Sequence, residues 1–283
     1  MLAGMDLSRE PDLRPGRRTV LGLAAGVGVA ATLARPLPSY ARSAQAAAAD
    51  GPILKPTPPA WFVSYGTNAE MRWDSVDHDR FRTPQSRLFV RDHTRTPRID
   101  PETYRLAVFG DGLERPTGGA GATRLSLRDL RALPRTRITT VHECTGNGRS
   151  FFGSQQGTPT PGTQWTLGAV GAVTWEGVRL AEVLRRLGVS RDAVDVMATG
   201  LDPSYVDKGT DHGPVRRPLP VAKALDDAVL AWGMNGRDLL PDHGFPLRLV
   251  VPGWVGIASI KWLGSLEVSR SRLTSPWTRR GTG

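Results

Sequence analysis

The sequence predicts a mixed α+β domain with several short sheets and few helices. Glycine and proline, 32 and 23 of the 283 residues, make up about a fifth of the chain, more than a helical bundle usually contains. Short β-branched or alternating runs separated by turn residues are typical of strands, and only one or two segments have the apolar spacing of an amphipathic helix.

The folded part follows an Ala- and Pro-rich stretch, residues 47–59, which we interpret as a linker. Ser126 is placed to cap a short helix over residues 127–132. Apolar residues three and four apart predict a second helix over residues 180–187, ending at Gly188. Strands are predicted at residues 104–108, 138–141, 193–197, 247–251 and 260–268. We assign residues 60–270 to one domain and residues 271–283 to a tail.

Residues 1–46 have the pattern of a twin-arginine export signal. The pair Arg17-Arg18 precedes an apolar stretch over residues 20–33, and Ala44-Gln45-Ala46 supplies an A-x-A cleavage site. The apolar stretch is too short to cross a bilayer core of about 30 Å, so we expect no stable membrane span once the signal is removed. The alternative is a basic disordered tail before a buried helix. Export by this route predicts a periplasmic or otherwise extracytoplasmic protein.

The charge balance favours small anions as ligands. The formal net charge is +10, and cleavage of the signal, with its six arginines and three acidic residues, leaves +7. Because no run of Lys and Arg is long enough to follow a phosphate backbone, we predict no nucleic-acid partner.

The single cysteine, Cys144, lies in the loop VHECTGNGRS, residues 141–150. One cysteine excludes an internal disulfide, a c-type haem and a Cys-ligated iron–sulfur cluster, so any electrons must leave to another protein. Gly146 and Gly148 allow the backbone to turn around a bulky ligand, and Arg149 favours a thiolate. Two alternatives remain: a buried structural cysteine, and a nucleophile with His142 as its base, although we expect His142 to point away from the thiol.

The string HECTGNGR resembles the cysteine loop of the sulfite oxidase family of molybdenum enzymes, and the resemblance extends from about Phe81 to Trp277. Four further segments agree in order, namely LFVRDH at 88–93, GTQWTLGAVGAVTWEGVRL at 162–180, GLD at 200–202, and MNGRDLLPDHGFPLRLVVPGWVG with IKWLG at 234–264. The resemblance implies that residues 60–270 form a mixed α/β molybdopterin-binding domain carrying a molybdenum–molybdopterin cofactor.

The resemblance also implies a role for each site residue. Cys144 would be the single protein ligand of molybdenum, a soft ligand beside the pterin sulfurs. Arg91 and Arg149 would orient an oxyanion, and Trp165 would bound the pocket. The pterin and its phosphate would be held by Phe89, Val90, Arg91, Asp92, His93, Asp202, His243, Arg248, Ser259, Ile260 and Lys261.

Two of these assignments have simpler interpretations on residue type alone. Arg248 would be a residue of an edge strand or a core arginine paired with an acidic residue, and His243 would lie in an exposed turn. His78 and His212 have no counterpart in the resemblance, and we interpret both as surface residues.

The implied activity is two-electron oxygen-atom transfer to sulfite or a related small oxyanion, with electrons passed to an external acceptor such as a cytochrome c. Two positions depart from the family pattern: Asp92 replaces an Asn and would repel dianions, and Thr282 replaces the active-site tyrosine of animal-type enzymes. The chain also stops before the family's immunoglobulin-like dimerisation domain, so it is either truncated or has a more open site, and a dimer is doubtful. The alternatives are an exported molybdenum reductase of sulfoxide-type substrates and a pterin-binding chain without turnover.

Overall fold

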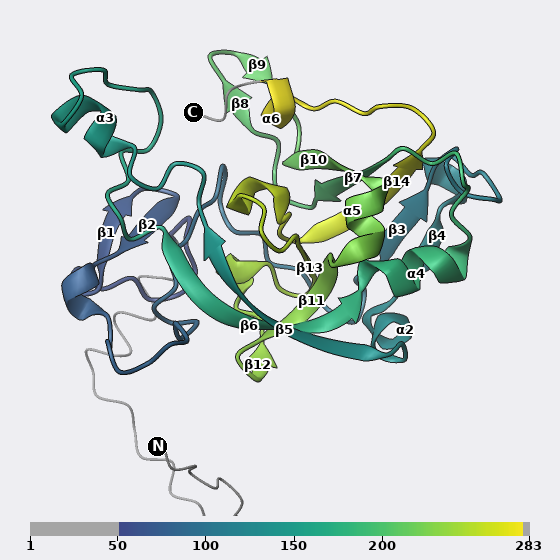
Figure 1. Ribbon diagram of the computed structural model, residues 1–283, viewed down its shortest axis with the longest axis horizontal. Coiled ribbons are helices and arrows are strands. Elements are labelled where there is room, and N and C mark those ends of the chain that lie inside the picture. The colour runs from purple at the N-terminus through teal and green to yellow at the C-terminus, as the bar shows by residue number, and fades with distance from the viewer. Residues whose placement is uncertain (1–50, 280–283) are drawn as a thin grey trace, which may run out of the picture. The chain divides into compact units, whose positions relative to one another are not determined.

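The computed structural model describes residues 51–279 and confirms the predicted mixed α+β class (Figure 1). Within these residues the strands form two five-stranded sheets and two short hairpins. No helix in this range is long and apolar enough to cross a membrane. Residues 1–50 and 280–283, which include the predicted export signal and Thr282, lie outside the described residues.

The first sheet carries most of the helices. Its strand order is β10 (Arg216–Pro220), β7 (Asp195–Gly200), β14 (Leu263–Ser269), β3 (Leu106–Phe109) and β4 (Thr123–Leu125). Only β14 and β3 run parallel to one another, because the other neighbours pair antiparallel. Leu130, Leu184 and Ala224 enter its core from α2 (Leu127–Arg131), α4 (Leu180–Leu187) and α5 (Val221–Asp226).

The second sheet leads to the cysteine loop. Its order is β12 (Arg237–Asp238), β11 (Val229–Met234), β6 (Val170–Arg179) and β5 (Arg135–Glu143), with β13 (Arg248–Val250) paired to β11. Figure 1 shows β5 and β6 as a long curved pair. A second apolar core joins this sheet to the hairpin of β1 (Phe62–Tyr65) and β2 (Asn68–Met71).

The remaining elements are short. The strands β8 (Val206–Asp207) and β9 (Thr210–Asp211) form a hairpin, and α3 (Ser150–Ser154) and α6 (Pro276–Arg279) each make about one turn. Single 3₁₀ turns occupy Trp73–Ser75, Gly119–Gly121, Pro241–His243 and Gly256–Ala258.

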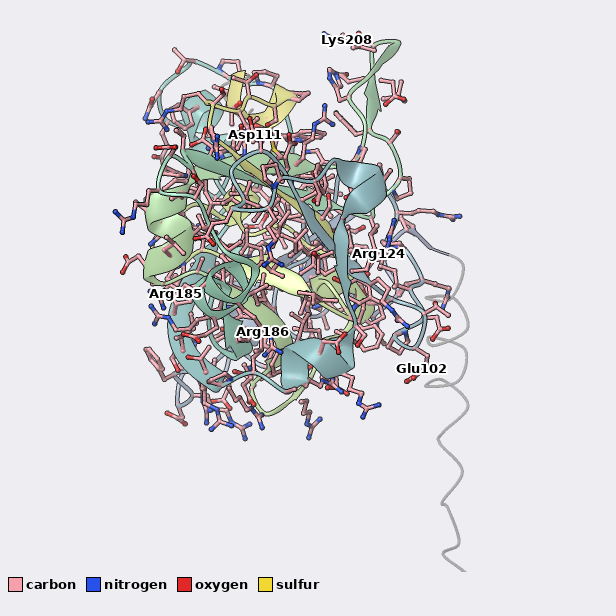
Figure 2. The ribbon with its side chains drawn as sticks, turned by 90° about the vertical axis from the view of Figure 1, so that its right-hand side faces the viewer. Glu102, Asp111, Arg124, Arg185, Arg186 and Lys208 are labelled. Atoms are coloured by element: carbon pink, nitrogen blue, oxygen red, sulfur yellow. The ribbon has the colours of Figure 1, made fainter. Side chains whose placement is uncertain are left out.

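Both predicted helices are confirmed. The Ser126 side chain accepts a hydrogen bond from the Asp129 amide, and the Asp129 carboxylate accepts one from the Ser126 amide, which forms a capping box at the start of α2. Helix α4 ends at Gly188, whose φ of +78° suits a residue without a Cβ. Figure 2 shows Arg185 and Arg186 on the outer side of α4, as its apolar spacing predicts.

Two differences from the sequence predictions affect the description of the site. Strands β6 and β11 were not predicted, because most of their residues are buried and the sequence therefore lacks the alternation of a half-exposed strand. The stretch interpreted as a linker is also part of the fold from residue 51 onwards, since Ile53 and Lys55 are both buried.

Candidate functional site

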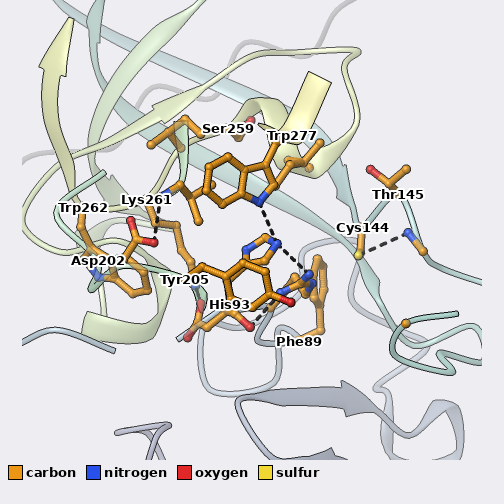
Figure 3. A pocket seen from close by; sticks show the side chains of 18 of the residues that line it. Phe89, His93, Cys144, Thr145, Asp202, Tyr205, Ser259, Lys261, Trp262 and Trp277 are labelled. Atoms are coloured by element: carbon orange, nitrogen blue, oxygen red, sulfur yellow. Dashed lines mark hydrogen bonds and ion pairs between the residues drawn. The ribbon is translucent and has the colours of Figure 1, made fainter. Parts of the chain in front are cut away.

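A cavity of about 740 Å³ opens where the two sheets and the β8–β9 hairpin approach one another (Figure 3). It is lined by the cysteine loop, by the loop after β2, by the turn after β7 and by the segment between β13 and β14. Twelve of the predicted site residues line it: Phe89, Arg91, Asp92, His93, Cys144, Arg149, Asp202, His243, Arg248, Ser259, Ile260 and Lys261.

Cys144 lies directly after β5, at the end of the curved strand pair. Its amide donates to the Ala169 carbonyl (2.9 Å), and its sulfur accepts a weak hydrogen bond from the Gly146 amide (3.4 Å). A side chain at Gly146 would approach the Arg149 guanidinium to 2.7 Å, and Gly148 has a φ of +80°. The loop therefore needs its glycines to present a half-exposed thiol beside an arginine.

The expectation that His142 points away from Cys144 is wrong. Alternate residues of a strand share a face, and both side chains line the cavity. The His142 ring stacks on Phe89 with 5.9 Å between centroids, and its Nε2 lies 3.4 Å from the Arg248 guanidinium. Burial, and then Arg248, lower its pKa to about 3. His142 is therefore neutral, lies beside an arginine and shares the cavity with Cys144.

Two arginines flank the thiol. Arg91 donates to the Asp92 carbonyl (2.7 Å), and Arg149 donates to the Thr163 carbonyl (3.2 Å). Burial lowers the pKa of both guanidinium groups, and the neighbouring Cys144 opposes that shift at each. Both side chains stay cationic at neutral pH, so a charged wall stands next to the sulfur.

The opposite wall is polar and mostly cationic. Arg248 donates to the carbonyls of His243 and Ser259 (3.0 Å each) and lies over the Trp175 ring at 4.7 Å. Burial lowers its pKa to about 9. Lys261 contacts the Asp92 carboxylate and donates to the Asp242 carbonyl (2.8 Å).

Asp92 has a partner that the sequence did not reveal. Its carboxylate is buried, pairs with Lys261 and accepts a hydrogen bond from Thr96 (3.1 Å). The predicted repulsion of dianions by Asp92 is therefore offset at short range by a cation.

The protonation state of His93 follows from its donors. The Trp277 indole (3.0 Å) and the Arg91 guanidinium (3.1 Å) both approach its Nε2, and neither can accept a hydrogen bond. The Nε2 atom must therefore accept, which leaves the ring proton on Nδ1. Burial, and then Arg91, lower the pKa of His93 to about 3, in agreement with a neutral ring.

Two predicted site residues do not line the cavity. Trp165 is fully buried and packs edge-on against Phe89, 6.2 Å between centroids, so it supports the wall instead of forming it. Val90 is fully buried and pairs through its backbone with Ala69. Ser259 lines the cavity, but its hydroxyl accepts from the Val251 amide (3.0 Å).

Other lining residues were missed by the sequence reasoning. His212, interpreted as a surface residue, lines the cavity together with Tyr205, Lys208 and Trp277, whereas His78 is exposed as predicted. No pattern in the sequence marks these four, because the β8–β9 hairpin and α6 bring them together from separate segments.

A buried lysine from the misread linker supports the same wall. The Lys55 ammonium donates to the carbonyls of Leu88 and Gln85 and lies 3.4 Å from the His243 ring. The backbone amide of Lys55 donates to the Asp242 carboxylate (2.6 Å). Burial lowers the pKa of the Lys55 ammonium to about 7, and Asp242 opposes the shift.

The donor set fits an anionic cofactor with a soft metal. Among the described residues, the buried Nε of Arg248 has no hydrogen-bond partner, although both terminal nitrogens of the guanidinium donate to backbone carbonyls. Gly244 has a φ of +102°, and a side chain there would approach the Arg248 Cβ to 2.9 Å, so the backbone closes tightly around this cation. A single thiol faces the same cavity.

Comparisons with known proteins agree with this chemistry. The model of the oxidoreductase molybdopterin binding domain matches residues 93–277. The mitochondrial sulfite oxidase of Homo sapiens is 38% identical over 207 residues, which cover 71% of this chain and 36% of that protein. The NADH nitrate reductase of Ulva prolifera is 33% identical over 207 residues, covering 71% of this chain and 23% of that protein.

A solved structure shares the fold. The sulfane dehydrogenase SoxCD from Paracoccus pantotrophus superposes with a TM-score of 0.62 at 26% identity, covering 90% of this chain and 58% of that chain. The chain spans only about a third of the length of the human relative.

Proposed function

The chain belongs to the sulfite oxidase family of molybdopterin-binding oxidoreductases, and from this premise we propose that it oxidises sulfite or a related small sulfur oxyanion by two electrons. The observation that carries the proposal is the placement of the Cys144 thiol between Arg91 and Arg149 at a cavity whose other wall is cationic. For sulfite, the balanced reaction consumes water and releases sulfate, two protons and two electrons.

Each wall of the cavity has a task in this reaction. Cys144 would ligate the molybdenum, while Arg248, Lys261, His243 and Asp202 would hold the pterin and its phosphate. When bound, the molybdenum–pterin group supplies the oxygen transfer and takes up the electron pair.

The chain's own residues attract and orient the substrate. Arg91 and Arg149 are fixed by backbone carbonyls, so their charges are in place before an anion arrives, and little reorganisation is needed. Bidentate contacts from guanidinium groups suit the oxygens of a sulfur oxyanion. The neutral His93 beside Arg91 adds no competing charge.

The compartment and the acceptor belong to the same proposal. The twin-arginine pattern at residues 17–18 supports export of a folded, loaded protein to a compartment outside the cytoplasm. A chain with one cysteine has no iron–sulfur or c-type haem centre of its own, so a separate electron carrier, such as a cytochrome c, would receive the electrons singly.

The direction of catalysis is testable against a second candidate. The similarity to a nitrate reductase favours oxyanion reduction as the alternative. Protein produced in a host with the cofactor pathway should contain about one molybdenum per chain and oxidise sulfite with a dye or cytochrome c as acceptor. Reduction of nitrate or a sulfoxide by dithionite-reduced dye, without sulfite oxidation, would refute the proposed direction.

A further inference from the structure

The β8–β9 hairpin brings two unpaired polar groups to the mouth of the cavity. The hairpin is closed at its base by a backbone pair, in which the Tyr205 amide donates to the Gly213 carbonyl (3.0 Å) and the His212 amide donates to the Tyr205 carbonyl (2.9 Å). The two rings stack with 5.9 Å between centroids and an interplanar angle of 26°. Both side chains line the cavity, so the stacked pair is directed inward.

Neither side chain uses its hydrogen-bonding group within the described residues. The Nε2 atom of His212 is buried and has no partner there. No hydrogen bond joins the Tyr205 hydroxyl to any other residue between 51 and 279. A buried ring nitrogen without a partner is costly to the free protein, so a ligand in the cavity that hydrogen-bonds to it would remove that cost.

The pair faces the substrate side of the cavity. The Arg91 guanidinium lies 3.1 Å from Nε2 of His93. Figure 3 shows the Tyr205 ring beside His93, and the two centroids are 5.1 Å apart. Trp277 closes the cluster, 5.6 Å from His93 and 6.4 Å from His212. The hydroxyl and the imidazole thus lie on the same side as the arginine that would orient an oxyanion.

We propose that Tyr205 and His212 form the second half of the oxyanion site, hydrogen-bonding to substrate oxygens that the arginines do not reach. The inference rests on the proposed function, because it names the residues that orient the anion for it. Arg91 and Arg149 supply charge, whereas the hairpin supplies directional hydrogen-bonding groups. Lys208, which lines the cavity and lies at the tip of the hairpin, adds a cation at its entrance (Figure 2).

Ring-preserving variants test the pair. Tyr205→Phe removes only the hydroxyl, and His212→Phe removes the ring nitrogens while keeping an aromatic ring. The readouts are molybdenum content, kcat/KM for sulfite, and the Kd of sulfate measured by titration calorimetry. We expect each variant to raise the sulfate Kd and lower kcat/KM about tenfold, as for one lost hydrogen bond to a charged ligand, with molybdenum content unchanged. His212→Gln, which keeps an N–H donor, should stay within about threefold of the wild type.

Tyr65→Phe is the matched control. Its hydroxyl donates to Glu70 (3.0 Å) and the Gln164 carbonyl (3.2 Å), and the side chain does not line the cavity, so sulfate binding should not change. Sulfate Kd values for both Tyr205→Phe and His212→Phe within twofold of the wild type would overturn the inference.

A measurement on the wild-type protein covers the case in which the variants fold poorly. With histidine labelled by ¹⁵N, saturating sulfate should shift the His212 ring nitrogens in the NMR spectrum, and no shift would also overturn the pairing. The proposed function can fail independently of this inference. If the loaded enzyme does not oxidise sulfite but still binds sulfate in a way that depends on Tyr205 and His212, the anion site stands and only the proposed activity is refuted.

Discussion

Gly244→Ala tests how tightly the backbone closes around the cofactor wall. Gly244 follows the 3₁₀ turn Pro241–His243 with a φ of +102°, and an added Cβ would lie 2.9 Å from the Arg248 Cβ and 3.3 Å from the Lys261 Cα. The left-handed backbone costs roughly 1–2 kcal/mol for any L side chain. Overpacking against two backbone-anchored cations adds about 1–3 kcal/mol.

Gly66→Ala provides the matched control, because Gly66 has a φ of +73° and nothing within 4 Å of its added Cβ. Gly66→Ala therefore carries the cost of a left-handed backbone but not the cost of overpacking. For a domain of this size 1 kcal/mol corresponds to about 2–4 °C in Tm, so Gly244→Ala should unfold roughly 2–12 °C below Gly66→Ala. The assay is thermal unfolding by circular dichroism, with molybdenum analysis of both proteins. Equal Tm values and equal molybdenum contents for the two variants would refute the tight closure of the backbone around Arg248.

Three further variants probe the site. Cys144→Ser should abolish molybdenum binding and sulfite turnover, while its Tm stays within about 3 °C of the cofactor-free wild type, because the thiol is half-exposed and accepts one weak hydrogen bond; retained metal by elemental analysis would contradict this. Burial raises the pKa of Asp202 from 3.8 to about 6. Ionising this carboxyl therefore lowers the free energy of unfolding progressively as the pH rises from 4 to 6, and above pH 6 the loss stays constant. Urea unfolding of cofactor-free Asp202→Asn should therefore show a gain of about 3 kcal/mol at pH 7.5 that vanishes below pH 4, and a gain independent of pH would exclude this cause. Lys55→Met leaves the Leu88 carbonyl unpaired, while the Gln85 carbonyl keeps the His243 ring as a donor, and should cost about 1–3 kcal/mol in the same assay, whereas a true linker residue would cost nothing.

The parts of the fold that sequence predicted are those governed by local chemistry. The capping box at Ser126 and the stop at Gly188 depend on residues within one turn, so their positions could be read directly. The burial of Lys55 could not be predicted from sequence, because the Asp242 carboxylate that accepts a hydrogen bond from its backbone amide is 187 residues away.

The site divides in the same way. Cys144 and the two arginines were found through a segment that resembles a known family, and the structure gathers them at one cavity. Tyr205 and His212 were missed because only the pairing across the β8–β9 hairpin turns them inward. The sequence carries no sign of that pairing beyond a glycine at its tip.

The walls of the cavity come from residues as far apart as Leu88 and Trp277. A chain cut between these two residues would therefore lack part of the wall, so the pocket can form only after residues 88–277 have all been synthesised. Binding of the proposed cofactor would thus report that this whole span has folded.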